Sequence, residues 1–314
     1  EYIRTALSRA GCEPYAGKSY DLPYSKSGYD FVNLVGFIPG KNRELPPLLI
    51  GAHYDSVIPH PCADDNGAAV AIALAVAEAM QPAHLERDLI VAIFDAEEPP
   101  YFNTPCMGSI RFYEDQIDDR GIHFAMIHDL VGHDISIPTS LIPGVNRIKI
   151  LAEKDIPVPI LKSGLFVTGC ESNPDLPAIV ASNEIPGIKV AATLNKYVGD
   201  MSDHGIFRKN GVPYLFFSCG RWAHYHSPTD TPDRLNYRKM ALIAELSLKI
   251  LTQIDNEALA GKPGKDHTLK YEIQSFKNLT GPLFPVLLRR LGLKKLETRQ
   301  EIETLVYGMM SAGI

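Results

Sequence analysis

A histidine and an aspartate two positions apart end the first long apolar run of the sequence. The run begins at Leu48 and leads into His53 and Asp55. If it forms a strand, the alternation of side chains puts His53 and Asp55 on the same face at the strand's end. A carboxylate is the usual partner of an imidazole that binds a metal. The pair therefore predicts a metal site, provided that further ligands follow in the sequence.

Further carboxylates follow at Asp64, Glu97, Glu98 and Asp129. Each of these groups has an ordinary structural explanation when taken alone. His53 could be a hydrogen-bonded core histidine, Asp64 a helix cap, and Glu97-Glu98 an acidic loop. Together, two histidines (His53 and His226) and several carboxylates at strand ends and in flanking loops form a nitrogen and oxygen ligand set that suits zinc.

The adjacent pair Glu97-Glu98 predicts a site that activates water. Neighbouring residues of an extended chain project in opposite directions, so one carboxylate could bind metal while the other faces a bound water. Because a metal lowers the pKa of its bound water, the second carboxylate could take the proton and generate the nucleophile.

Composition excludes several classes of protein. The 314 residues suffice for one large α/β domain or two small ones. The 31 basic and 37 acidic residues give a net charge of −6, which offers no footprint for nucleic acid or an anionic membrane. No apolar stretch is long enough to span a bilayer.

Five scattered cysteines without a CxxC motif favour reduced thiols, and the chain begins at Glu1 without a methionine. We therefore expect a soluble protein, either cytoplasmic or exported with its signal peptide removed.

Buried apolar strands alternate with helices along the chain. This pattern predicts a single α/β domain with a central mixed, mostly parallel sheet flanked by helices on both faces. Functional residues of such folds gather at the carboxyl ends of the strands. Strands are expected at 19–23, 31–37, 46–57, 88–94, 124–130 and 212–219, and helices at 1–11, 67–80, 108–117 and 237–257.

Two regions have less regular patterns. Within 134–200, residues 145–152 could form a strand, while 154–169 and 177–184 could form helical turns. Residues 261–266 are linker-like, and the tail from 270 carries leucines among lysines and arginines, as one or two helices would. We therefore expect a main domain over 1–260 and a C-terminal helical extension over 261–314 packed on the same domain.

Five short motifs occur in order between about residue 30 and residue 257. They are Gly51-Ala52-His53-Tyr54-Asp55-Ser56, Ala63-Asp64-Asp65-Asn66-Gly67, Phe94-Asp95-Ala96-Glu97-Glu98, His128-Asp129-Leu130-Val131-Gly132 and Tyr225-His226-Ser227-Pro228-Thr229-Asp230-Thr231. In this order they resemble the co-catalytic zinc aminopeptidases of the bacterial leucyl aminopeptidase type, which are related to glutamate carboxypeptidase and glutaminyl cyclase. The resemblance implies a zinc peptidase domain over 1–260 that hydrolyses N-terminal residues from peptides.

The resemblance also implies a role for each residue that matches a family position. Two Zn²⁺ ions per chain would be bound, one by His53 and Asp129, the other by Glu98 and His226, with Asp64 bridging them. The implied catalytic residues are Asp55, which would orient His53, Glu97, which would be the general base, and Tyr225, which would stabilise the oxyanion. His128, His133 and His224 are not expected to bind metal, because their neighbours fill the family's positions.

The implied partner is a peptide with a free N-terminus, with no nucleic acid or membrane and an undetermined oligomeric state. The sequence departs from the family pattern in three places. An insertion at Pro99–Met107 lies beside the site and is expected to shape the substrate pocket. Ser202–Phe207 is similar to a segment of the glutaminyl cyclase branch, and the tail after Gly261 carries no family motif.

Two alternatives follow from the same residues. A glutaminyl cyclase-like zinc acyltransferase typically uses one zinc, lacks the second aspartate of Asp64-Asp65 and carries tryptophan in place of Tyr225, so both features favour the peptidase. A non-catalytic binding protein with the peptidase fold would usually lose ligands or the base, whereas every one is present here.

Overall fold

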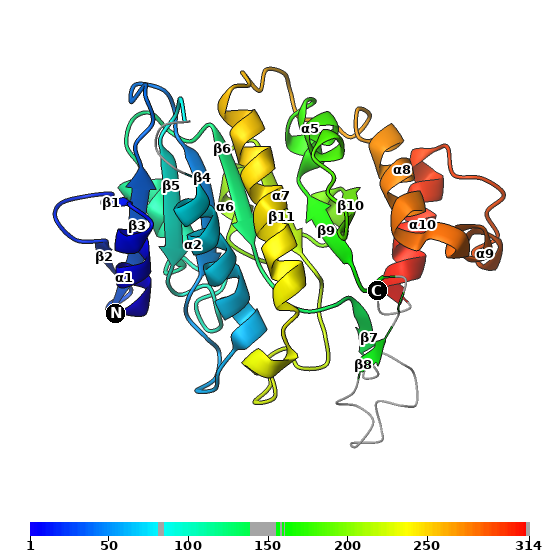
Figure 1. Cartoon of the computed structure of the whole chain (residues 1–314), viewed down its shortest axis with the longest axis horizontal. Coiled ribbons are helices and arrows are strands. Elements are labelled where there is room, and N and C mark those ends of the chain that lie inside the picture. The colour runs from blue at the N-terminus through cyan, green and yellow to red at the C-terminus, as the bar shows by residue number, and fades with distance from the viewer. Residues whose placement is uncertain (81–84, 139–154, 158, 160, 312–314) are drawn as a thin grey trace.

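A computed structural model describes residues 1–80, 85–138, 155–157, 159 and 161–311. Within these residues, nine strands form one mixed sheet in the order β1-β3-β5-β4-β6-β11-β9-β10, and β2 pairs with β3 (Figure 1). The strands are β1 (Glu13–Pro14), β2 (Asp21–Lys26), β3 (Tyr29–Ile38), β4 (Leu48–His53), β5 (Leu89–Phe94), β6 (Phe124–His128), β9 (Gly164–Thr168), β10 (Lys189–Thr193) and β11 (Tyr214–Ser218). A separate ladder joins β7 (Ser136–Pro138) to β8 (Asp155–Pro157). The α/β fold with a mixed sheet is confirmed.

The four central strands, β5, β4, β6 and β11, run parallel to one another. In this register His53 pairs with Phe94 and Gly51 pairs with Ile127. The carboxyl ends of β4, β5 and β6 therefore meet at one edge of the sheet. This edge is where α/β folds bind ligands.

Helices cover both faces of this sheet. The helices are α1 (Tyr2–Arg9), α2 (Ala69–Ala79), α3 (Gly108–Arg111), α5 (Leu176–Ser182), α6 (His204–Lys209), α7 (Tyr237–Asp255), α8 (Leu269–Thr280), α9 (Phe284–Arg290) and α10 (Arg299–Ser311). Figure 1 shows α2, α7 and α5 side by side on one face. None of the described helices is long and apolar enough to cross a bilayer.

The two helix layers explain why the strands read as continuous apolar runs. On β5, residues 89, 91 and 93 belong to the core beneath α2 and α7, whereas residues 90, 92 and 94 belong to the core with α6. Alternate positions of one strand are thus buried on opposite faces, as in other sheets covered on both sides. This parity decides the direction of the polar side chains that follow each strand.

The middle of the chain differs in part from expectation. Residues 154–169, predicted to form helical turns, contain the strands β8 and β9 instead. β9 is built from Leu165, Phe166 and Val167 and pairs with both β10 and β11, so long-range pairing decides its conformation. The helical turn predicted at 177–184 is confirmed as α5. The strand predicted at 145–152 lies outside the described residues.

The C-terminal tail forms three α-helices among the described residues, where one or two were predicted. The extra break falls at Gly281-Pro282, where proline removes a backbone donor and ends α8. α8 packs along the edge strand β10, where the Ser275 hydroxyl donates to the Ala192 carbonyl at 3.3 Å. A domain boundary at residue 260 stays a prediction.

A buried ion pair joins α8 to α10. The Arg299 Nη1 lies 2.6 Å from the Glu272 Oε1, and the carboxylate of Glu272 is fully buried. Arg299 also donates to the Thr268 hydroxyl at 2.8 Å. Burial raises the pKa of Glu272, and the contacts with Thr268 and Arg299 act against this shift.

We expect Arg299→Met to lower the free energy of unfolding by about 3 kcal/mol, because removing one member of a buried pair leaves the other uncompensated. Chemical denaturation followed by circular dichroism measures this change. The control is Lys295→Met, which breaks the exposed pair with Glu297 and should leave stability unaltered. Equal effects of the two substitutions would contradict the importance of the buried pair.

Candidate metal centre

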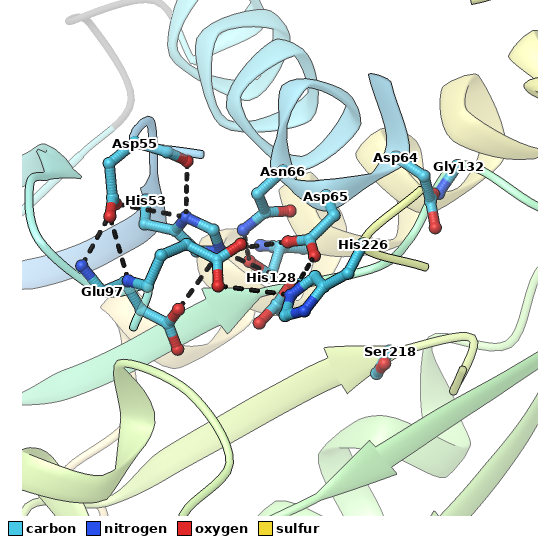
Figure 2. A network of polar contacts seen from close by, with 12 residues as sticks. His53, Asp55, Asp64, Asp65, Asn66, Glu97, His128, Gly132, Ser218 and His226 are labelled. Atoms are coloured by element: carbon cyan, nitrogen blue, oxygen red, sulfur yellow. Dashed lines mark hydrogen bonds and ion pairs between the residues drawn. The ribbon is translucent and has the colours of Figure 1, made fainter. Parts of the chain in front are cut away.

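Asp65 lies at the centre of a cluster of buried donors. Its Oδ1 is 3.4 Å from the Nε2 of His53, and its Oδ2 is 3.2 Å from the Nε2 of His226. Figure 2 shows these side chains turned toward one another from β4, the turn η1 (Ala63–Ala68) and the segment after β11. Although burial opposes ionisation, the contacts with the two histidines lower the pKa of Asp65 to about 2. One carboxylate therefore faces two separate groups of ligands.

The remaining donors complete these two groups. Asp129 Oδ1 lies 3.8 Å from His53 Nε2, and Glu98 Oε2 lies 3.2 Å from His226 Nε2. Ligands at about 2.1 Å from a tetrahedral zinc ion lie about 3.4 Å apart, which is close to these separations. The spacing of the donors therefore fits metal ions on both sides of Asp65.

The hydrogen bonding of the cluster leads to the same conclusion. Five nitrogen and oxygen atoms of the cluster that could bind a metal make no hydrogen bond within the described part of the chain. They are His53 Nε2, Asp65 Oδ2, Glu98 Oε1, Asp129 Oδ1 and His226 Nε2. Buried polar atoms without partners are costly, and a bound cation satisfies lone pairs that converge on one point. The residues present therefore fit a metal centre.

Asp64, predicted to bridge two metals, does not lie in this cluster. Figure 2 shows Asp64 beside Gly132. The Oδ1 of Asp64 accepts from the Gly132 amide at 2.6 Å, and its Oδ2 lies 2.7 Å from His133 Nδ1. A Cβ at Gly132 would lie 2.8 Å from the Asp64 carboxylate, so only glycine allows this contact. Asp64 also forms no helix cap. The geometry thus corrects the prediction: of the two aspartates, it is Asp65 that lies between His53 and His226.

Asp55 contacts His53 and the backbone of the Glu97-Glu98 pair. Its Oδ1 lies 3.4 Å from His53 Nδ1, as expected for the group that orients this imidazole. Its two oxygens also accept from the amides of Glu97 and Glu98, at 3.1 and 2.9 Å. One carboxylate therefore fixes both the ligand on β4 and the two acidic residues after β5.

Glu97 lies beside the ligands with its carboxylate facing the cluster. Its Oε2 is 3.7 Å from His53 Nε2, and only 5% of the residue is exposed. Burial raises the pKa of Glu97 well above its ordinary value; the charge of Asp129 adds to this shift and that of His53 opposes it. Glu97 therefore belongs to the buried cluster, in one group with His53 and Asp129.

The other histidines named in the sequence have different partners. His128 lies on the opposite face of β6 from Asp129, where its Nε2 is 2.9 Å from the Ser247 hydroxyl of α7. His133 contacts Asp64, and the Nδ1 of His224 lies 2.7 Å from the Thr229 hydroxyl. None of the three belongs to the donor groups found among the described residues.

Asp230 connects the two segments that supply Asp65 and His226. Its carboxylate accepts from the amides of Asp64, at 2.9 Å, and Asp65, at 3.1 Å, and it is almost fully buried. The sequence motif contained Asp230, but the spacing alone gave no reason to assign it a role. Its contacts hold the backbone of the turn that carries Asp65 in place.

We expect Asp230→Ala to weaken metal binding about 10- to 100-fold, the usual effect of losing a group that positions a ligand. Two buried amides would lose their acceptor, so stability should also fall by about 1–3 kcal/mol. Titration with a chromophoric chelator and thermal unfolding measure the two effects. The control is Asp233→Ala, an exposed acid three residues further on, which should change neither quantity.

A cleft of about 680 Å³ opens over the donor cluster. Its floor is the sheet itself, where Thr193, Thr168 and Phe216 form one row across β10, β9 and β11. Pro99 and Phe102 of the insertion line one side, as expected for a segment that shapes the pocket. Arg221 is the one lysine or arginine among the described residues of the lining.

Tyr225 lies at the edge of the cleft next to His226. The two rings stack with centroids 3.7 Å apart, and the Arg221 guanidinium lies 4.9 Å from the centroid of the tyrosine ring. Burial raises the pKa of the Tyr225 hydroxyl, so the group stays protonated and can donate a hydrogen bond. Its role at an oxyanion stays a prediction.

Comparison with known proteins gives a consistent result. A model of peptidase family M28 matches residues 33–147 and 177–251. The uncharacterized protein YfbL of Escherichia coli (strain K12) is 26% identical over 281 residues, which cover 80% of this chain and 78% of YfbL. The solved structures that share the fold include the following two. The LapA aminopeptidase of Legionella pneumophila has a TM-score of 0.60 at 17% identity, covering 82% of this chain and 64% of LapA. The glutaminyl cyclase of Tannerella forsythia has a TM-score of 0.52 at 18% identity, covering 82% and 88%.

The chain spans about half to two thirds of the length of the first aminopeptidase structures that it matches. At these identities the likeness shows the fold alone. Any activity must therefore be argued from the residues of the cluster and the cleft.

Proposed function

Because the chain belongs to peptidase family M28, we propose that it is a zinc-dependent aminopeptidase that removes N-terminal residues from peptides. The observation that carries this proposal is the bridging position of Asp65 between His53 and His226, with Glu97 beside the ligands. That arrangement suits hydrolysis at two neighbouring metal ions.

The proposal assigns two ions to the two donor groups, one with His53, Asp65 and Asp129, the other with Asp65, Glu98 and His226. When bound, the ions would polarise the scissile carbonyl and lower the pKa of the attacking water. Glu97 accepts the proton of that water and later delivers it to the leaving amine. Tyr225 donates its hydroxyl proton toward the developing oxyanion.

The groups that line the cleft favour an aminopeptidase over a carboxypeptidase. Glu97, Glu98, Asp65 and Asp129 line one end. Because two bound zinc ions would balance the charges of these carboxylates, the free α-amino group of a peptide would bind there as a neutral amine at a metal ion, with a carboxylate as its hydrogen-bond acceptor. An N-terminal residue held in this way would place its own carbonyl next to Glu97. Cleavage would then be restricted to the first peptide bond.

The experiment that tests the proposal combines metal analysis with a substrate panel. The zinc-loaded protein is expected to bind two ions per chain, to hydrolyse free aminoacyl-anilides and to leave their N-acetylated counterparts intact. Retained metal with cleavage of neither substrate would overturn the proposal.

A glutaminyl cyclase activity is the second candidate, because the fold is shared with the Tannerella forsythia enzyme and because Asp203 lies buried beside the site. Neither oxygen of Asp203 has a hydrogen-bond partner in the described part of the chain, and burial raises its pKa to about 7. Incubation with a peptide that begins with glutamine separates the two functions. Release of ammonia with a cyclised N-terminus, without anilide hydrolysis, would favour the cyclase.

A further inference from the structure

The C-terminal helices supply part of the wall of the cleft. Phe276 of α8 and three residues of α10, Val306, Met309 and Met310, line it together with the metal-binding residues. The match to the family model ends at residue 251, so these four residues lie outside it. The cleft is therefore completed by a segment that the family's sequence pattern does not contain.

α10 is held in place by contacts with the segment that follows β10 and with α8. The Lys196 ammonium group pairs with Glu303, and the rings of Tyr197 and Tyr307 meet edge to face with centroids 5.6 Å apart. The Glu272–Arg299 pair fixes the start of the helix. Ile302 and Leu305, on the side away from the cleft, are fully buried in the main core. The wall formed by α10 is thus a built part of the fold.

The two ends of the cleft differ in chemistry. Carboxylates and His226 line the metal end, whereas α8 and α10 contribute the apolar side chains of Phe276, Val306, Met309 and Met310. Two residues with a hydroxyl group, Thr193 and Tyr197, also line the cleft and lie next to these helices. An apolar side chain that packs on the apolar residues gains about 25 cal/mol per Å² of apolar surface buried. Methionine side chains are flexible and adapt to different apolar shapes.

We propose that α10 forms the far wall of the subsite for the N-terminal side chain, and that Met309 sets which large apolar side chains are accepted. This inference rests on the proposed aminopeptidase function, because it places the α-amino group at the metal end and the side chain toward α10. Substrate selection then depends on the C-terminal helices as well as on the catalytic domain.

The test compares Met309→Ala with Met240→Ala. Met240 on α7 is as buried as Met309, with 7% against 6% exposed, but it does not line the cleft. For Met309→Ala we expect the ratio of kcat/KM for phenylalanyl-anilide to that for alanyl-anilide to fall about tenfold, since apolar contacts of this size discriminate by roughly 10- to 200-fold. The Met240→Ala ratio should equal that of the unaltered protein.

A second variant guards against loss of folding. Met310 is 43% exposed, so Met310→Glu should fold, as circular dichroism can verify, and it places a charge in the apolar wall. We expect the same ratio to fall in this variant. An unchanged ratio in both folded variants would overturn the inference.

Binding without turnover separates this inference from the proposed function. Phenylalaninol and alaninol carry the amine and the side chain but no scissile bond, and calorimetry measures their affinity for the zinc-loaded protein. Tighter binding of phenylalaninol that Met309→Ala removes would support the subsite even if no anilide were hydrolysed. Hydrolysis of anilides with equal binding of both alcohols would retain the proposed function and overturn the subsite.

Discussion

Asp65→Asn is expected to weaken metal binding by more than 100-fold, whereas Asp64→Asn should leave binding within about tenfold of the unaltered protein. The carboxylate of Asp65 faces both histidines, so its loss removes a charge from each donor group. Replacing even an outer partner of a metal ligand costs roughly 10- to 100-fold in affinity, and a shared ligand should cost more. Competition with a chromophoric chelator measures the affinity.

The two aspartates form a matched pair for this comparison. They are adjacent, both are buried, and the same change from carboxylate to amide is made at each. Asp64→Asn disturbs the contacts with Gly132 and His133, so its main effect should be a loss of stability of about 1–3 kcal/mol. If Asp64→Asn released the metals while Asp65→Asn kept them, the bridging assignment made from the structure would be wrong.

The strand-end residues could be predicted from the sequence because their directions follow from strand parity. His53 continues β4 on the face of Leu49, and Asp129 continues β6 on the face of Ala125 and Ile127, so both reach the same side of the sheet. The apolar runs fixed the strands, and parallel register then brought the ends together. The predicted family is confirmed by the match of its model over residues 33–147 and 177–251, which include these strand ends.

Strand parity could not predict which of Asp64 and Asp65 faces His53 and His226. Both lie in the turn η1, where the backbone of Asp65 (φ −111°, ψ 83°) is neither helical nor extended, so no simple period assigns the side chains to faces. The choice depends on Gly132 and His133, which lie about 68 residues further along the chain and offer Asp64 its partners. A local motif carries no information about such distant contacts.

The apolar end of the cleft was also beyond sequence reasoning. Strands β9 and β10 and helix α10 contribute to it, and each is placed by long-range packing within a region of irregular pattern. The tail showed helical periodicity, which predicted its helices but not the surface on which they pack. The contacts between distant segments that form this end of the cleft could therefore be identified only from the structure.

Glu97→Gln is expected to lower kcat by about 10³-fold while the protein keeps both metals. General acid–base catalysis contributes roughly 10²- to 10⁴-fold, and Glu97 is proposed to act at both proton transfers. The amide keeps the size of the side chain but cannot accept the proton of the attacking water. Steady-state hydrolysis of a leucyl-anilide, together with metal analysis of the same sample, measures both quantities.

Glu98→Gln is the matched control for this experiment. Glu97 and Glu98 are adjacent and equally buried, with 5% and 4% exposed, and their amides share the Asp55 carboxylate. Because the Glu98 carboxylate lies 3.2 Å from His226 Nε2, its neutralisation should lower metal occupancy at that side, and excess zinc should restore part of the activity. Excess zinc should not rescue Glu97→Gln, since its defect lies in proton transfer. If zinc rescued Glu97→Gln as well, Glu97 would be acting as a ligand and the attacking water would need a different base.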